Sequence, residues 1–101
     1  DEIDTGVGGA VADAIGQRLS RLASGVQVLA VTHAPQVAAR AGAHFLIAKD
    51  LAEAGHVATS VTPLTNAPRL EEVARMLAGD RITKEARAAA RSLLDRAKQG
   101  G

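Results

Sequence analysis

A short apolar run rich in valine, VQVLAV, occupies residues 26–31. Such a run is typical of a strand that is covered on both faces in a parallel sheet. Pro35 follows closely, and because proline is favoured in the first turn of a helix, a short helix is predicted over 35–41. Another helix is predicted before the strand. The order helix, strand, helix indicates an α/β fold in which 26–31 is an interior strand.

The first predicted helix lies between Gly9 and Gly25. Three glycines within residues 6–9 predict a loop before it, and Gly25 is expected to end it. Apolar residues recur at helical spacing, which predicts one buried stripe. This stripe consists of Val11, Ala14, Ile15, Leu19 and Leu22.

Two more strands and two more helices are predicted in the second half. Strands at 43–49 and 57–64 are expected to form a hairpin or neighbouring edge strands, and Pro63 places the second at an edge or ends it. One helix follows from its cap Asn66 to Gly79, and the last runs from its cap Thr83 to about residue 98. Their predicted inward residues are Leu70, Val73, Ala74, Leu77, Ala86, Ala90, Leu93 and Ala97.

Length and composition limit the size and class of the domain. With 101 residues, positions 1–101 are expected to form one small domain or a piece of a larger one. Hydrophobic residues make up 47%, but Phe45 is the only aromatic, so an aliphatic core is expected.

The net charge of +1 does not mark a nucleic-acid or membrane binder, and the lack of cysteine excludes a disulfide scaffold and a thiolate metal site. No apolar run approaches the ~20 residues that span a bilayer. The chain starts at Asp1 with neither methionine nor a leader, which we interpret as a cut inside a longer protein.

His33 is the first candidate for chemistry. It follows the predicted strand, and ligands of open α/β sheets bind outside the carboxyl ends of strands. Because a helix is predicted directly after it, backbone N–H groups and the helix dipole favour an anion such as phosphate there. The alternative is that Thr32 and His33 only cap that helix. His44 and His56 are interpreted as structural, since no carboxylate spacing indicates a metal site.

The adjacent carboxylates Asp1 and Glu2 are the second candidate. At the end of a strand, one carboxylate can hold Mg²⁺ while the other orients or deprotonates the attacking water in phosphoryl transfer. The alternative is a solvated terminus, because the sequence contains no strand before Asp1. The glycines that follow match neither the dinucleotide fingerprint nor the phosphate loop, so a simple turn into a helix is also open for them.

Together, the segments DEIDTGVGG (1–9) and VLAVTHAPQVAARA (28–41) resemble the Walker B to switch-histidine region of the RecN family. These bacterial proteins are relatives of the structural maintenance of chromosomes (SMC) proteins and ABC-type ATPases. The segment RLEEVARMLAGDRIT (69–83) is similar to the family's closing segment, so the resemblance covers essentially the whole chain. It implies part of a P-loop NTPase head of ABC/SMC type, with a short parallel sheet plus hairpin strands flanked by helices.

The resemblance also implies roles for individual residues. Asp1 would help hold Mg²⁺ through water, Glu2 would be the general base, and His33 would contact the γ-phosphate of ATP. The loop from Asp4 to Gly9 would lie across the interface between two heads. SMC proteins carry an aspartate where this chain has Gly8, so the expected cross-interface and nucleotide-binding element is the glycine backbone. It consists of Gly6, Gly8 and Gly9, and Gln36 receives no firm role.

The function implied by the resemblance is ATP-dependent repair of DNA double-strand breaks and recombination. It implies two paired heads, DNA as a partner of the full-length protein, and a place at the nucleoid in the bacterial cytoplasm. Neither a GxxxxGK[ST] phosphate loop nor an ABC signature segment occurs in the sequence. The 101-residue chain alone is therefore expected neither to bind ATP tightly nor to hydrolyse it.

Two other functions remain open alternatives. An SMC-type head fragment should read AALD where this loop reads TGVG, so the loop speaks against it. A non-catalytic α/β interaction module would make the acidic start and His33 structural. Basic residues on the last helix could contact DNA phosphates, but a solvated helix face is the favoured interpretation. These residues are Lys84, Arg87, Arg91 and Lys98.

Overall fold

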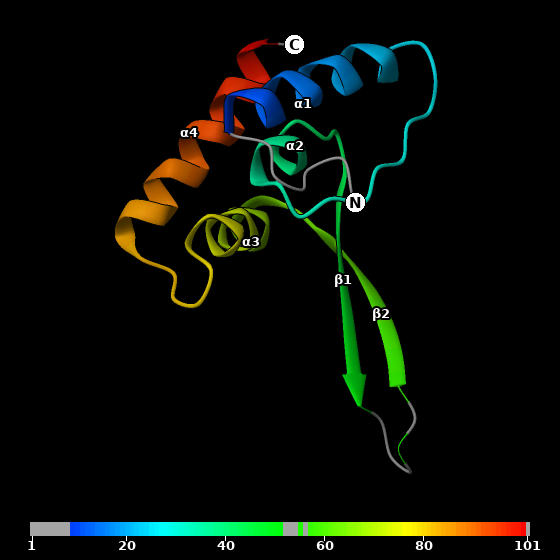
Figure 1. Ribbon diagram of the computed structural model, residues 1–101, viewed down its shortest axis with the longest axis vertical. Helices are drawn as coiled ribbons and strands as arrows, with labels where there is room; N and C mark the ends of the chain where they lie inside the picture. Colours follow the sequence, from blue (N-terminus) through cyan, green and yellow to red (C-terminus); the bar gives the residue numbers. More distant parts are fainter. Residues whose placement is uncertain (1–8, 52–54, 56, 101) are drawn as a thin grey trace.

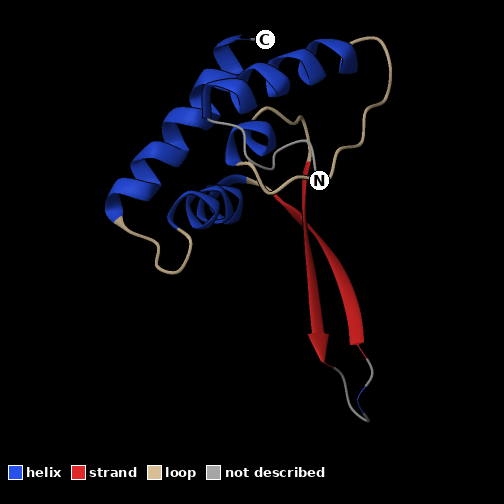
Figure 2. Cartoon of the chain, viewed as in Figure 1, coloured by secondary structure: helices blue, strands red, loops and turns tan. Residues whose placement is uncertain are grey.

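The computed structural model describes residues 9–51, 55 and 57–100. In Figure 1 the helices gather in one body, and a two-stranded hairpin extends away from it. Figure 2 shows the same division between helices and strands. In chain order the elements are α1 (Gly9–Ala23), α2 (Pro35–Ala39), β1 (His44–Leu51), β2 (Val57–Leu64), α3 (Asn66–Ala78) and α4 (Lys84–Gly100).

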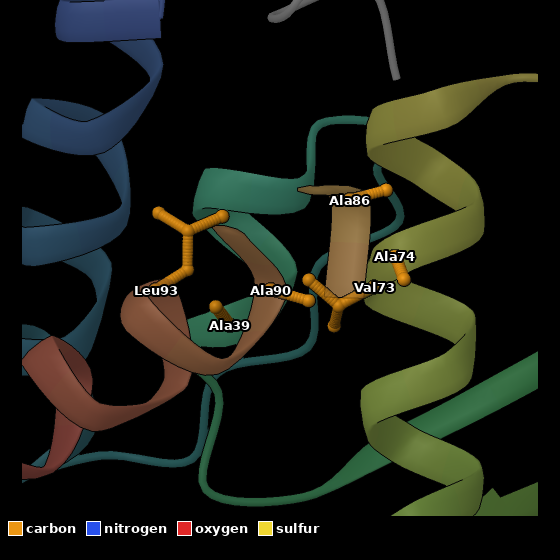
Figure 3. Close-up of a cluster of buried hydrophobic side chains, with 6 residues drawn as sticks. All are labelled: Ala39, Val73, Ala74, Ala86, Ala90 and Leu93. Atoms are coloured by element: carbon orange, nitrogen blue, oxygen red, sulfur yellow. The ribbon is translucent and has the colours of Figure 1, made fainter. Parts of the chain in front are cut away.

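The short helix α2 holds the helical body together. It contacts α1 on one side and both α3 and α4 on the other, while α3 packs along α4. A first core cluster lies between α2, α3 and α4, and alanine predominates in it, which lets the helices approach closely (Figure 3). Its buried members are Ala39, Val73, Ala74, Ala86, Ala90 and Leu93. A second cluster, Ala12, Ala34 and Val37, joins α1 to α2.

These clusters confirm the predicted aliphatic core and the inward faces of the last two helices. The predicted ends of these helices are also largely confirmed. The Thr83 hydroxyl accepts a hydrogen bond from the backbone N–H of Ala86 at 3.0 Å, which caps α4. Gly79 ends α3 with φ 85°, a conformation that glycine adopts without strain. The prediction of Asn66 as a cap is wrong, because Thr65 is the N-cap of α3 and Asn66 is its first residue.

The predicted interior strand is wrong. Residues 26–31 lie in the loop between α1 and α2, where Leu29 is 89% exposed. The described part of the chain has one sheet, the antiparallel pair β1–β2, so the predicted short parallel sheet is wrong as well. A strand forms only where a neighbour pairs its backbone N–H and C=O groups, and no described segment offers 26–31 such a neighbour.

The predicted hairpin is confirmed. Strands β1 and β2 pair in register from His44 opposite Leu64 to Leu51 opposite Val57. Pro63, which has no N–H to donate, stands opposite Phe45 in a sheet whose strands are both at an edge, as predicted. Much of the hairpin surface is apolar and exposed, including Phe45 and Ile47.

The buried face of α1 differs from the predicted stripe. Ala12 and Gly16 are the buried residues of this helix, and Ile15 and Leu19 are partly buried beside them. Val11 and Leu22 are 50% and 56% exposed, and Ala14 is exposed as well, so the prediction that these three residues are buried is wrong. The reason is that α2, the partner of α1, is only five residues long and does not cover these outer positions.

Arg69 of α3 joins α3 to the end of α2. Its Nη2 donates hydrogen bonds to the backbone carbonyls of Ala38 at 3.1 Å, Ala39 at 3.4 Å and Ala41 at 2.7 Å. These carbonyls belong to the last turn of α2 and the residues after it, where backbone acceptors lack intrahelical partners. Burial lowers the pKa of the Arg69 guanidinium from its ordinary value.

His44, the first residue of β1, lies close to this guanidinium. Burial and then the charge of Arg69 lower the pKa of His44 from its ordinary value of 6.5, and Glu72 opposes them in part. The Nδ1 atom of His44 is buried without a hydrogen-bond partner among the described residues. The folded state therefore favours neutral His44.

We predict that the chain loses stability as the pH falls from about 7 to about 5. The pKa of His44 is lower in the folded state than in the unfolded state, so only the unfolded chain gains this proton just below pH 6.5. The contribution of His44 is complete above that value and is lost as the pH falls toward the folded pKa. Urea unfolding at both pH values measures this loss, and His44→Gln should reduce it. An equal loss in the variant would contradict the assignment.

Candidate functional site

Most of the predicted nucleotide-binding residues lie outside the described residues. This applies to Asp1, Glu2, Asp4, Gly6 and Gly8, whose roles stay predictions. Gly9 is described and is the first residue of α1, so the predicted loop does not include it. Its backbone is exposed at the start of the helix.

His33 lies on the surface directly before α2. The helix begins at Pro35, as predicted, and its N-cap is Ala34. The Thr32 hydroxyl accepts a hydrogen bond from the backbone N–H of Ala34 at 2.9 Å, which fixes the turn that carries His33. His33 is exposed. The predicted strand before it is absent from the described structure, and the turn and α2 position this side chain instead.

A close packing contact fixes α2 against α1. A Cβ atom built on Gly16 would lie 3.0 Å from both the backbone O of Gln36 and Cγ of Arg40, and 3.3 Å from Cα of Val37. Glycine at position 16 therefore lets the two helix backbones approach closely. An ion pair supports the same contact, because Nη2 of Arg40 lies 3.5 Å from Oδ1 of Asp13.

The packing of α2 on α1 brings Gln36 of the second predicted motif against Gly9, the last residue of the first. Gln36, three residues after His33, lies against Gly9 at the end of the glycine-rich segment, and a Cβ atom at position 9 would be 3.2 Å from Gln36 Nε2. Beside this contact is an open cleft of about 360 Å³ between the first turn of α1, α2 and α4. Its lining residues are Gly9, Ala10, Asp13, Gln36, Leu93 and Arg96.

Gly16 and Gln36 were assigned no function from the sequence. A signal for Gly16 exists, since glycine inside an amphipathic helix costs about 1 kcal/mol relative to alanine and usually has a packing reason. No comparable signal marks Gln36, because its contact with Gly9 joins two segments that are far apart in the sequence.

The basic face of α4 is exposed, as both interpretations of it require. Lys84, Arg87, Arg91 and Lys98 are exposed. Arg87 is also engaged within the chain, because its Nε and Nη2 donate to the Glu71 carboxylate at 2.7 and 3.2 Å. These hydrogen bonds lower the pKa of Glu71 from its ordinary value.

Over the ranges 9–51, 55 and 57–100, three or more histidine and carboxylate side chains nowhere gather in a way that could hold a metal ion. None of the helices in those ranges has both the length and the apolar character that crossing a membrane requires.

Comparison with known proteins identifies close relatives of this sequence. The chain is 49% identical over 94 residues to DNA repair protein RecN of Xylella fastidiosa, which covers 93% of the chain. It is 44% identical over 99 residues to the Bacillus subtilis protein of that name, and 51% identical over 80 residues to the one of Deinococcus radiodurans. These alignments cover 98% and 79% of the chain. The chain spans about 17% of the length of the Xylella and Bacillus relatives. No protein-family model matches it.

Proposed function

The chain belongs to the RecN family, and on this premise we propose that it forms the carboxy-terminal part of an ATP-hydrolysing head, over residues 1–101. The full-length protein would act in DNA double-strand break repair and recombination, at the nucleoid in the bacterial cytoplasm. The observation that carries this proposal is the 44–51% identity to proteins named for DNA repair. The Bacillus alignment covers 98% of the chain, which leaves at most a few residues of either predicted motif outside it.

In this proposal the acidic and glycine-rich segments provide one part of an ATP site. Asp1 would help hold Mg²⁺, Glu2 would take the proton of the attacking water, and Asp4 to Gly9 would face a second head across a dimer interface. When bound, Mg²⁺ neutralises charge on the phosphates. The phosphate loop would come from another part of the full-length protein.

Among the described residues, His33 and Gly9 fit the proposed site best. Both are exposed, and the packing of α2 on α1 holds the segments that carry them together. His33 can donate a hydrogen bond to a phosphate oxygen through its ring N–H. Gly9 has no side chain that would separate its backbone from a ligand or a second head.

Exposed apolar residues support the proposal that the chain needs the remainder of a head. They occur on α1, on the loop 26–31 and on the hairpin, and soluble proteins rarely leave large contiguous apolar patches uncovered. We infer that other segments of the full-length protein cover them. The exposed residues are Val11, Leu22, Val26, Leu29, Val31, Phe45, Ile47, Val57 and Val61.

A repair assay in cells tests the proposed function. In a bacterial strain that lacks its own RecN-type protein, the full-length protein should restore survival after induced double-strand breaks. The same protein with Glu2→Gln should accumulate to the same level without restoring survival. Full survival with Glu2→Gln would contradict a role for ATP hydrolysis, and no rescue by the unaltered protein would contradict the repair function.

A further inference from the structure

We propose that Arg69 is a positioning residue for ATP hydrolysis. It holds the carboxy-terminal end of α2 and, through the hydrogen bonds of that helix, fixes the turn that carries His33. The inference rests on the proposed function, in which His33 contacts the γ-phosphate of ATP. It assigns Arg69 a role in hydrolysis beyond that of joining α3 to α2.

The first step is the contact between Arg69 and the end of α2. The Nη2 atom of Arg69 donates hydrogen bonds to the carbonyl oxygens of Ala38, Ala39 and Ala41 at 3.1, 3.4 and 2.7 Å. The last carbonyls of a helix lack partners within it and carry the negative end of its dipole, so a cation is stabilising there. Hydrogen bonds from a charged donor are also stronger than those between neutral groups. Arg69 of α3 therefore stabilises the end of α2 from a neighbouring helix.

The second step is the dependence of α2 on such support. The helix has five residues, Pro35–Ala39, whereas isolated helices of fewer than about 12 residues are marginal in water. Its N-cap is Ala34, whose methyl group cannot accept a hydrogen bond from the first turn. Arg69 therefore supplies side-chain hydrogen bonds at one end of a short helix that has no side-chain cap at the other.

The third step is the path from this end of α2 to His33. The backbone N–H of Ala38 donates to the carbonyl O of Ala34 at 3.1 Å, and the backbone N–H of Ala34 donates to the Thr32 hydroxyl at 2.9 Å. Thr32 directly precedes His33. Contiguous hydrogen bonds within a short, rigid element carry a displacement from one end to the other. A shift at the end that Arg69 holds therefore moves the turn that carries His33.

The chemistry of the contact determines which residues can replace Arg69. All three hydrogen bonds come from one nitrogen, Nη2, while Nε is buried and has no partner among the described residues. A lysine ammonium is also a single charged nitrogen with several N–H groups, on a somewhat shorter side chain. Glutamine is neutral and shorter still. Lysine is therefore expected to keep part of the contact, and glutamine to lose it.

Steady-state ATP hydrolysis by the full-length protein carrying Arg69→Gln tests this role. The expected result is a decrease in kcat of between about tenfold and 100-fold, as for a small misplacement of a catalytic group. KM for ATP should stay close to that of the unaltered protein, because the phosphate loop would come from another part of it. Arg69→Lys should recover part of the lost kcat.

Arg75→Gln is the matched control, since it makes the same change on the same helix. The Arg75 side chain is 53% exposed and pairs with Glu72 of α3 at 2.6 Å, away from the end of α2. This variant should keep the kcat of the unaltered protein. An equal decrease in both variants would overturn the inference, because it would show a general effect of removing charge from α3.

A double-mutant cycle with His33→Ala separates positioning from a general structural effect. If Arg69 acts through His33, Arg69→Gln should cause little additional loss of kcat once the imidazole is absent. Strongly non-additive effects support the inference. Additive effects, an unchanged kcat in Arg69→Gln, or a decrease explained by loss of folded protein in thermal unfolding would overturn it.

The single variants His33→Ala and Glu2→Gln distinguish failure of this inference from failure of the proposed function. If both lower hydrolysis strongly and Arg69→Gln does not change it, the ATPase proposal stands and the role of Arg69 is wrong. If His33→Ala alone has no effect, the role of His33 is wrong, and the inference about Arg69 is wrong with it. If Glu2→Gln also has no effect, the proposed function is wrong as well.

Discussion

Replacing Gly16 with leucine is expected to lower the free energy of unfolding of the chain by about 3 kcal/mol. Even the first side-chain atom, a Cβ at this position, would lie 3.0 Å from the backbone O of Gln36 and 3.3 Å from Cα of Val37. Backbone atoms cannot turn aside as the end of a flexible side chain can. A leucine side chain must therefore separate α1 from α2, which also uncovers Ala12 and Val37 of the second core cluster.

Helix propensity does not explain the expected loss. Leucine is the better helix former, so the substitution would stabilise α1 by roughly 0.8 kcal/mol if packing did not matter. Ala14→Leu is the matched control, because Ala14 lies on the exposed side of the same helix. Urea unfolding followed by circular dichroism should show a clear loss for Gly16→Leu and almost none for Ala14→Leu. Equal stability of the two variants would contradict the described packing of α1 on α2.

The parts of the fold that were predicted correctly are fixed by nearby residues. Strand β2, helices α3 and α4, and the end of α3 follow from local periodicity and from single residues such as Thr83 and Gly79. The hairpin follows equally locally, because β1 and β2 are consecutive in the chain and pair with each other. A cap or a hairpin needs no distant partner, so a short sequence window contains the necessary information.

The parts that were predicted wrongly depend on distant partners. The run 26–31 has the composition of an interior strand, but composition does not supply the neighbouring strands whose backbone must pair with it. Val11 and Leu22 have helical spacing, but burial also needs a partner that covers them, and α2 is too short to do so. In both cases the pattern describes what the segment can do and not what lies beside it.

The candidate site likewise combines a feature that nearby residues predict with one that depends on a distant contact. His33 was placed correctly before a helix, because Pro35 is a local signal. The contact between Gln36 and Gly9 was missed, because it depends on how closely α1 packs on α2. The roles of Asp1, Glu2, Asp4, Gly6 and Gly8 rest on the resemblance and remain predictions.

Changing Glu2 to glutamine is expected to decrease ATP hydrolysis by the full-length protein by about 100-fold to 10,000-fold, the usual contribution of a general base. Glutamine has almost the shape of glutamate but cannot accept the proton of the attacking water. Binding of ATP should persist, because Asp1, His33 and the phosphate loop of the full-length protein are unchanged. Glu53→Gln, the same change in a segment without a proposed role, is the matched control and should leave hydrolysis unaltered.

The measurement that tests the ATPase head most directly combines single-turnover hydrolysis with the oligomeric state of full-length Glu2→Gln in Mg²⁺ and ATP, with and without DNA. The predicted result is that bound ATP stays intact and that paired heads accumulate beyond the level of the unaltered protein, since hydrolysis no longer separates them. Hydrolysis at the unaltered rate, with no additional pairing, would contradict the account and would make the acidic segment at the start of the chain structural.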